Sequence, residues 1–523
     1  MDMSGRDNSP ERGVKRKYTG DGPDVRGPDK FATTTDIRVS SVSSSAVPEP
    51  PVSTTDLASG LSVPKNDDYY KTLYIDEPDF RVLGQRDPEF KAVLQRGSHL
   101  DFADPKSVML LTKTLLKLDF GLVVDLPMDR LCPPVPNRHN YILWLKELLD
   151  SSSPACLGSS DPARNVVGLD IGTGASLIYP LLGCAQRPSW SFIATDVDAK
   201  SLAYARKNVQ LNNLGSRIRV VGRSVTDCLI PMDELAIEAI NFVMVNPPFY
   251  TSEAELLDLA RQKSRPPNTA CTGAPIEMVC DGGEIGFVRR IIDESLVLKE
   301  RVQWYTSMLG KQSSLGVLVD ALKGHGVTNY AVTAFVQGNK TRRWAIGWSF
   351  GSRRPSLSAS RGCEPSAGKK LLPPPTEAMI GTWRRSQATP EQLQRAICDT
   401  MESLDLVSWT WDKPLSRGVG FANGNVWSRS YRRKRARERG STDSTSERVA
   451  QGGIPYSQKG QLGQKTEQHI AKCAFGFSVT IMVSRDTQND ADQSVVMARW
   501  LQGSEYALFE SFVGLLRTSI HPA

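Results

Sequence analysis

The sequence predicts an α/β fold: a doubly wound, mostly parallel sheet of seven strands, with a helical region before it and a small α+β domain after it. Three observations indicate this architecture. Between residues 165 and 350, apolar runs of strand length alternate with stretches of helical spacing, which is typical of strand–helix–strand units with right-handed crossovers. A segment rich in serine, arginine, glycine and proline then interrupts the pattern, and a second set of strand and helix patterns follows it.

The expected strands are short apolar runs, several of which end in glycine, aspartate or proline. They are 165–171, 191–195, 217–221, 241–245, 302–309, 330–336 and 344–350. Helices are expected at 197–212 and at 284–298. In the second helix, one face carries Val288, Ile291, Ile292 and Ser295.

The region before the sheet is expected to be helical, from residue 66 to residue 150. Asp104 followed by Pro105 is a typical helix start, and the apolar residues after them recur at helical spacing as Val108, Leu111, Leu115 and Leu118. Residues 1–65 are rich in Ser, Thr, Pro, Asp and Gly and poor in aromatic residues. Such a segment buries too little apolar surface to offset its ordering entropy, so we expect a disordered tail there.

The C-terminal part is predicted to hold a linker at 351–375 and an accessory α+β domain at 376–523. Residues 475–483 are expected to form a strand, and 492–516 are expected to be helical. A basic insert at 432–467, expected to be disordered, splits this domain and begins with Arg432, Arg433, Lys434, Arg435, Arg437 and Arg439. Together with Lys15, Arg16 and Lys17, this cluster suggests nuclear import or a non-specific RNA tether.

Composition restricts the function classes. The net charge is +7, a mild basic excess that is compatible with a polyanionic partner. Nine cysteines are scattered without a C-x-x-C pair, and there are five histidines, so neither a metal site nor a disulfide framework is expected. The polar first twenty residues do not resemble a secretory signal, and no apolar run is long enough for a membrane helix. We expect a nuclear protein, which could also be cytoplasmic.

A glycine loop follows the first expected strand, in Asp170-Ile171-Gly172-Thr173-Gly174. Glycines there let the backbone approach a ligand, and the next helix offers its N-terminus. An acid, Asp196, follows the second strand, where it can accept hydrogen bonds from both ribose hydroxyls of a nucleoside cofactor. Because NAD-binding proteins share this pattern, the two signals predict a nucleoside cofactor without identifying it. Asp198 fits better as a helix cap.

The third signal is Asn246-Pro247-Pro248-Phe249, at the end of the fourth expected strand. The prolines stiffen the turn and leave backbone carbonyls as acceptors. The Asn246 amide oxygen and one such carbonyl can hold the two hydrogens of a planar amino group, and Phe249 can stack on the ring that carries it. Such an arrangement suits transfer of a methyl group to the amine. That reaction would depend mainly on positioning and would need no dedicated general base.

These loops together resemble amino-group methyltransferases of the Rossmann-like class. A closer resemblance, to the U6 small nuclear RNA adenine N6-methyltransferase family, covers roughly residues 77–350. It rests on several separate motifs, which are Asp101 to Pro105, Asp119 to Leu122, Val135 to Tyr141, Asp170 to Leu182, Asp281 to Glu284, Trp304 to Lys311 and Gln337 to Ala345.

The resemblance implies that residues 66–350 form a methyltransferase domain using S-adenosyl-L-methionine. It implies that the tetrad, Asn246 to Phe249, is catalytic. It also implies cofactor binding by Arg138, Asp170, Gly172, Gly174, Asp196 and Asn246. Relatives place a cofactor-gating loop after strand three, but here the corresponding segment, 222–227, matches only loosely.

Structured RNA needs basic side chains for its phosphates. The candidates are Arg96, Arg261, Lys263, Arg265, Lys311, Lys340, Arg342 and Arg343, of which Arg96, Arg265, Lys311, Lys340 and Arg343 are preferred. U6 small nuclear RNA is the first expected substrate, and mRNA hairpins are a second.

Three different functions remain compatible with the same residues. A protein glutamine N5-methyltransferase presents the same planar amide to such a tetrad, although those relatives more often carry Tyr at the fourth position, where this chain has Phe249. An RNA-binding protein that has lost catalysis would not need the intact tetrad, Asp196 and glycine loop. A DNA adenine methyltransferase would act on the same amine, but the sequence has no recognisable DNA-reading motif.

Overall fold

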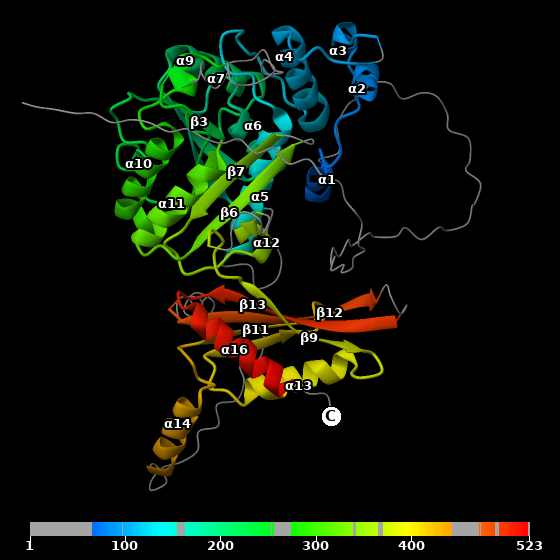
Figure 1. Ribbon diagram of the computed structural model, residues 1–523, viewed down its shortest axis with the longest axis vertical. Helices are drawn as coiled ribbons and strands as arrows, with labels where there is room; N and C mark the ends of the chain where they lie inside the picture. Colours follow the sequence, from blue (N-terminus) through cyan, green and yellow to red (C-terminus); the bar gives the residue numbers. More distant parts are fainter. Residues whose placement is uncertain are drawn as a thin grey trace, which may run out of the picture. The chain divides into compact units, whose positions relative to one another are not determined.

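The computed structural model describes residues 65–96, 98–153, 163–252, 254–255, 273–337, 341–363, 370–441, 470, 472–486 and 491–520. The chain divides into a first unit, Met1–Ser62, and a second, Val63–Ala523. Only the second contains described residues (Figure 1). The expected tail at 1–65 therefore lies outside them, apart from Lys65. None of the helices in the described part is long and apolar enough to cross a bilayer.

Helices make up the region before the sheet, as the sequence predicts. They are α1 (Asp67–Thr72), α2 (Phe80–Arg86), α3 (Pro88–Val93), α4 (Pro105–Leu115), which continues as the π-turn η1 (Leu116–Phe120), and α5 (Val135–Ser151). The Asp104 carboxylate caps α4 by accepting hydrogen bonds from the backbone N–H groups of Lys106 and Ser107, at 3.3 and 3.0 Å.

The central sheet has the strand order β3-β2-β1-β4-β5-β7-β6-β8. Its strands are β1 (Val166–Ile171), β2 (Trp190–Asp196), β3 (Ile218–Gly222), β4 (Ile240–Val245), β5 (Val302–Leu309), β6 (Tyr330–Gln337), β7 (Thr341–Trp348) and β8 (Arg361–Gly362). Strand β7 runs antiparallel to β5 and β6, and the other neighbours are parallel.

Two expectations about this sheet need correction. The seven predicted strands are present, but the described residues add an eighth, because Arg361 and Gly362 pair with Val332 and Thr333 of β6. This strand lies inside 351–375, so the expected linker is partly a sheet edge. The last predicted strand, 344–350, instead begins at Thr341, since it forms an antiparallel pair with β6 from Gln337 onward.

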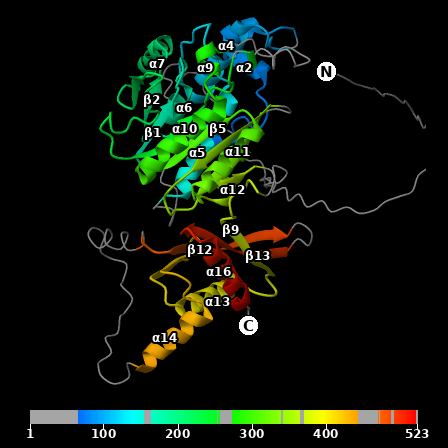
Figure 2. The ribbon, with the colours of Figure 1, turned by 60° about the vertical axis from the view of Figure 1, so that its left-hand side comes forward.

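Helices cover both faces of the sheet (Figures 1 and 2). Besides α5, they include α6 (Ile178–Gln186), α7 (Ala199–Leu211), α10 (Gly283–Leu298), α11 (Gln312–Gly324) and α12 (Leu357–Ser360). The short helix α9 (Pro275–Met278) buries none of its residues and belongs to the loops at the edge of the sheet. Along β4, Phe242 and Met244 enter the core shared with α5 and α6, whereas Val243 and Val245 enter the core shared with α10 and α11. Burial on both faces explains why such strands are continuous apolar runs.

The C-terminal part contains a separate antiparallel sheet, ordered β10-β11-β12-β13-β9. Its elements are β9 (Glu377–Arg384), α13 (Pro390–Glu402), β10 (Ser408–Asp412), β11 (Arg417–Ala422), α14 (Arg429–Ser441), β12 (Phe475–Asp486), β13 (Ala491–Gln502) and α16 (Tyr506–Ser519). Side chains of α13 and α16, among them Ile397 and Phe512, pack with Phe477 and Val496 in one core.

Two predictions for this part are wrong. Residues 492–516 are not one helix, because 491–502 form β13 and only the rest belongs to α16. The strand is indicated by the alternate burial of Ser494, Val496, Ala498 and Trp500. The basic cluster is not an unstructured insert over its described residues, since it lies on helix α14. Residues 442–467 lie outside the described part.

Candidate active site

The three predicted loops meet at one edge of the sheet. Strand β1 lies between β2 and β4 and is parallel to both, with Ile171 opposite Thr195 on one side and Val245 on the other. The loops that follow these strands therefore leave from the same edge, where open α/β sheets bind their ligands. The structure thus brings together the glycine loop, Asp196 and the Asn246 tetrad.

The glycine loop adopts a backbone that favours glycine at two positions. Gly172 and Gly174 have φ angles of 69° and 66°, in the left-handed region. The loop is tied to β2, because Thr173 N–H donates to the Thr195 carbonyl at 2.9 Å and Gly174 N–H donates to Asp196 Oδ2 at 2.8 Å. No described atom lies within 4 Å of the place where a β-carbon on Gly172 would stand, so the loop borders open space.

Asp170 carries a buried carboxylate at the end of β1. Its side chain is 1% exposed, and neither oxygen has a hydrogen-bond partner among the described residues. Burial raises the pKa of Asp170 to about 7; Asp196 adds to the shift, while the nearby Thr173 hydroxyl and Arg138 oppose it. An unpaired buried carboxyl is costly in a folded protein, and it indicates a missing ligand with hydrogen-bond donors or positive charge.

The two acids after β2 have different roles. Asp196 accepts hydrogen bonds from the backbone N–H groups of Gly174 and Asp198, and burial raises its pKa above the ordinary value. Asp198 caps helix α7 through the Ser201 N–H at 2.9 Å and forms an ion pair with Arg130 at 3.0 Å. Asp198 is therefore a structural residue, as the sequence indicates, and Asp196 is the residue placed beside the glycine loop.

Arg138 approaches the site from α5. It is 6% exposed, its guanidinium lies 5.6 Å from the centre of the Tyr179 ring, and its Nη1 lies 3.2 Å from the Met308 sulfur. No carboxylate of the described residues forms an ion pair with it. Because the described contacts of its guanidinium are an aromatic ring and a thioether, this buried arginine keeps most of its donors for an anionic group.

The tetrad continues β4 into a braced turn. The Asn246 amide oxygen is buried and has no described partner. The turn is held by Tyr250, whose N–H donates to the Met278 carbonyl and whose carbonyl accepts from Cys280 N–H, both at 3.0 Å. The Phe249 ring packs on Gly310, where an added β-carbon would come within 3.0 Å of it. An amide oxygen without a described partner, in the same turn as a packed aromatic ring, is suited to hold a planar amino group.

Two further acids support the site, and the sequence motifs assign a role to neither of them. Glu284 is 2% exposed and accepts hydrogen bonds from Gly310 N–H at 2.6 Å, Lys311 N–H at 3.1 Å and Ser314 Oγ at 2.6 Å. It thereby fixes the loop after β5 against Phe249. Its sequence signal is the Gly-Gly-Glu run that begins α10. Glu277, on α9, lies next to Gly174 and has no comparable signal.

Comparison with known proteins identifies the family. A family model described as RNA methyltransferase matches residues 67–352. The U6 small nuclear RNA (adenine-(43)-N(6))-methyltransferase of Schizosaccharomyces pombe is 33% identical over 433 residues, which cover 81% of this chain and 96% of that protein. The chain belongs to this RNA methyltransferase family. Enzymes of this family use S-adenosylmethionine, and the chain is such an enzyme.

Vertebrate relatives match over the methyltransferase domain. Human RNA N(6)-adenosine-methyltransferase METTL16 is 44% identical over 282 residues, covering 52% of this chain and 48% of that protein, so the chain spans about half of its length. Two crystal structures of the human protein are also similar. Its catalytic domain in complex with a MAT2A 3′UTR hairpin is 43% identical, covering 53% of this chain and 92% of that one, with a TM-score of 0.47. Its N-terminal domain in complex with S-adenosylhomocysteine is 41% identical, covering 54% and 97%, with a TM-score of 0.44.

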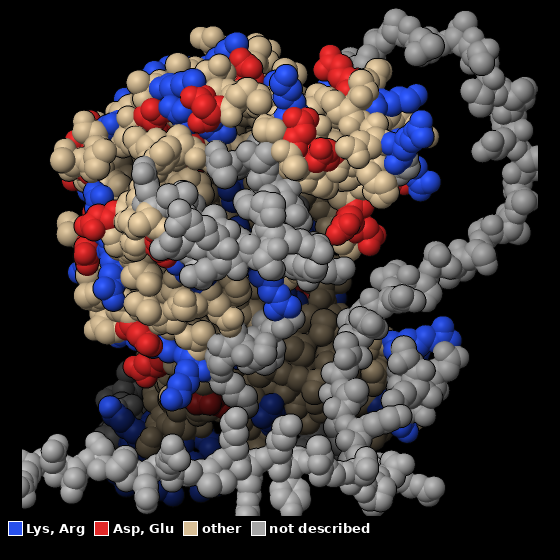
Figure 3. Space-filling model, turned by 45° about the horizontal axis from the view of Figure 1, so that its top comes forward, with Lys and Arg blue, Asp and Glu red and all other residues tan. Residues whose placement is uncertain are grey.

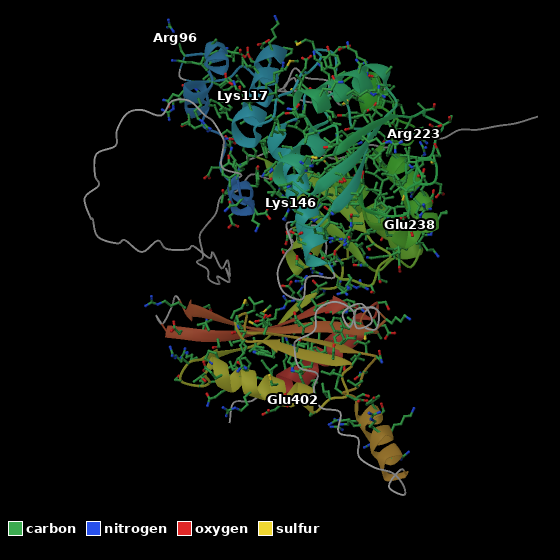
Figure 4. All side chains as sticks on the ribbon, turned by 180° about the vertical axis from the view of Figure 1, so that it is seen from behind. Arg96, Lys117, Lys146, Arg223, Glu238 and Glu402 are labelled. Carbon is green, nitrogen blue, oxygen red and sulfur yellow. The ribbon has the colours of Figure 1, made fainter. Side chains whose placement is uncertain are left out.

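The predicted RNA-binding residues are only partly brought together. Arg343, on β7, lies over the Phe249 ring with its guanidinium 5.7 Å from the ring centre, and burial lowers its pKa. Lys311 also lies beside the tetrad but pairs with Glu255 at 2.8 Å. Arg96 lies shortly after α3 (Figure 4), and no contact between it and the tetrad is found among the described residues. Arg342 is exposed next to Arg343. Arg261, Lys263, Arg265 and Lys340 lie outside the described residues.

The face of the molecule drawn in Figure 3 is not uniformly basic. On the side of the molecule drawn in Figure 3, basic and acidic side chains alternate and do not form one continuous basic surface. Sequence-independent attraction to phosphates depends on how many cations reach them. Among the predicted RNA-binding residues that the structure describes, Arg343 is the one whose guanidinium lies over the Phe249 ring.

Proposed function

We propose that this enzyme transfers the methyl group of S-adenosylmethionine to the exocyclic N6 of an adenine in structured RNA, with U6 small nuclear RNA as the first substrate. The observation that carries the reaction is the buried amide oxygen of Asn246, which has no partner among the described residues and belongs to the same turn after β4 as Phe249. The choice of RNA rests on the S. pombe relative, whose name gives that substrate. mRNA hairpins are a second candidate, because the human relative was crystallised with one.

The residues present fit the cofactor. The unpaired Asp170 carboxylate suits a cationic amino group, and Arg138 suits a carboxylate. Asp196 can accept hydrogen bonds from ribose hydroxyls in addition to its two backbone N–H donors, and the open space beside Gly172 allows close approach of a ligand to the backbone. S-adenosylmethionine supplies an electrophilic methyl group attached to its sulfonium.

The tetrad prepares the adenine for the transfer. Asn246 Oδ1 accepts one N6 hydrogen, a backbone carbonyl of the proline turn accepts the other, and Phe249 holds the base by stacking. With both N–H bonds held, the nitrogen lone pair turns out of the ring plane toward the methyl group. A nitrogen–carbon bond forms as the carbon–sulfur bond breaks, and the N6 proton leaves afterwards to water or a carbonyl. Positioning therefore contributes most of the rate.

The adenine must leave its stack to reach this turn. Flipping costs least for a base that is unpaired or lies in a loop. Arg343 lies where the base would arrive, over the Phe249 ring. Its guanidinium can contact the flipped base or the neighbouring phosphate, so Arg343 supports binding of a looped adenine.

The test is methyl transfer to defined RNA. The full chain is incubated with methyl-labelled S-adenosylmethionine and a short RNA containing the U6 internal loop, and the RNA is digested to nucleosides. Label in N6-methyladenosine is expected, and it should be lost with Asn246→Ala but retained with Gln210→Ala, which removes an exposed amide on α7. A release-factor protein is incubated in parallel. Label in that protein alone would contradict the proposal in favour of glutamine methylation.

We also propose a nuclear location, supported by two basic clusters, at Lys15 to Lys17 and on helix α14. A fluorescent fusion of the full chain should accumulate in nuclei. Glutamine in place of Arg432, Arg433 and Lys434 should reduce that accumulation. A fusion that is uniformly distributed before any substitution would contradict this location.

A further inference from the structure

Two carboxylates flank Gly174 in the glycine loop. Asp196, at the end of β2, accepts the Gly174 N–H at 2.8 Å. Glu277, on α9, comes from a distant part of the chain, and its Oε1 lies 3.8 Å from the place where a β-carbon on Gly174 would stand. The loop therefore has an acid from β2 and an acid from α9 beside the same residue.

The two oxygens of Glu277 have different surroundings. Oε2 accepts hydrogen bonds from the backbone N–H groups of Leu131, at 3.0 Å, and Ala274, at 2.8 Å, and so joins two segments beside the glycine loop. No described residue donates a hydrogen bond to Oε1. Oε2 therefore anchors the side chain, while Oε1 faces the glycine loop with its acceptor capacity unused.

A second observation shows that this acidic site is built for a ligand. Asp170, at the end of β1, is 1% exposed, neither of its oxygens has a partner among the described residues, and it interacts electrostatically with Asp196. Three carboxylates around one glycine loop repel one another unless a ligand supplies donors or positive charge. Asp196 and Glu277 both approach Gly174, so the three carboxylates border the same loop.

We propose that Glu277 is a second ribose-binding carboxylate, whose Oε1 accepts a hydrogen bond from one ribose hydroxyl of S-adenosylmethionine while Asp196 accepts one from the other. This inference rests on the proposed use of the cofactor and adds a residue to its site. Because Oε2 is already occupied by two backbone donors, Oε1 is the oxygen that remains to accept the ribose hydroxyl.

The variant Glu277→Gln tests the role of Oε1 separately from that of Oε2. Its carbonyl oxygen can keep the bonds to the Leu131 and Ala274 N–H groups, so its NH2 group faces the loop and cannot accept a hydrogen bond. Binding of S-adenosylhomocysteine to the full chain is measured by calorimetry. Loss of a hydrogen bond to a charged acceptor is expected to raise Kd about tenfold or more. Glu238→Gln is the matched control, an exposed glutamate elsewhere on the surface (Figure 4).

Deoxy analogues identify the contacted group. The 2′-deoxy and 3′-deoxy forms of S-adenosylhomocysteine are measured with the wild type and with Glu277→Gln. With one of the two analogues, the variant should bind as well as the wild type, because the contact is already missing. An unchanged Kd of Glu277→Gln for S-adenosylhomocysteine itself would overturn the inference. It would also be overturned if, for both analogues, the affinity loss caused by the variant and the loss caused by the missing hydroxyl multiplied independently. If these affinity losses multiply and Glu277→Gln also has a lowered melting temperature, the role of Glu277 is purely structural.

The outcome is separate from that of the proposed function. S-adenosylhomocysteine binding needs no RNA, so the coupling to a ribose hydroxyl can hold even if U6 RNA is not methylated. A wild type that binds no S-adenosylhomocysteine would overturn both the inference and the use of this cofactor.

Discussion

Replacing Asp170 with asparagine should stabilise the protein without cofactor while removing cofactor binding. Asp170 is fully buried, its oxygens lack hydrogen-bond partners among the described residues, and burial raises its pKa to about 7 from an ordinary value of 3.8. A carboxyl whose pKa is raised on folding is favoured in its protonated form, so the folded state loses stability as pH rises from about 4 to about 7. Asparagine has a similar shape and cannot ionise, so it avoids this loss.

The magnitude follows from the pKa difference. Each tenfold change in proton affinity corresponds to about 1.4 kcal/mol, so the difference between 3.8 and about 7 corresponds to about 4 kcal/mol as an upper value. The gain from Asp170→Asn should be near its maximum above pH 7 and vanish near pH 4. Cofactor affinity should also fall in the wild type as pH drops below 7, because a cationic ligand requires the ionised carboxylate.

The assay is thermal or denaturant unfolding of the full chain without ligand, at pH 5 and pH 8, for the wild type and Asp170→Asn. At pH 8 the variant should unfold at a temperature several degrees higher, and at pH 5 the difference should shrink. Calorimetry with S-adenosylhomocysteine should show that the variant has lost binding. A variant that is equally or less stable than the wild type at pH 8 would refute the reasoning, because Asp170 would then have compensating partners in the protein.

Three other changes have defined outcomes. Phe249→Ala should lower kcat/KM for RNA about 10- to 100-fold through lost base stacking, and calorimetry should find S-adenosylhomocysteine binding unchanged; equal activity would argue against stacking. Arg343→Gln should weaken RNA binding and reduce the slope of log affinity against log salt by about one, whereas Arg219→Gln, at an exposed position on β3, should leave both unchanged. Gly168→Ala should cost about 1–3 kcal/mol of unfolding free energy, measured by denaturant titration, because its β-carbon would overlap the Phe242 ring; Gly215→Ala, with open space around it, is the control.

Local patterns were sufficient where a residue's role depends on its own strand and turn. Asp170, Gly172, Asp196 and Asn246 all lie at or just after the ends of apolar runs that became β1, β2 and β4. Strand tips in a parallel sheet share one edge, so these residues had to meet once the strands were recognised. The same holds for Asp104 and Asp198, whose capping roles depend on the next turn of helix.

Local patterns failed where long-range pairing overrides them. Arg361 and Gly362 lie in a segment of linker composition, and they form β8 only because β6 offers an open edge. Residues 491–502 have a composition compatible with a helix, but pairing with both β12 and β9 makes them the strand β13. Both cases follow from the same cause, since a strand is stabilised by partners that are remote in sequence.

The sequence by itself determined the sheet domain, its three functional loops and the methyltransferase family, because each of these depends on short motifs and their order along the chain. Only the tertiary structure showed that Asp170 is buried without a hydrogen-bond partner among the described residues, that Arg343 lies over Phe249, and that Glu277 faces Gly174. Those facts depend on burial and on contacts between distant segments. Neither is encoded by the residues next to these positions, and both arise only when the chain packs.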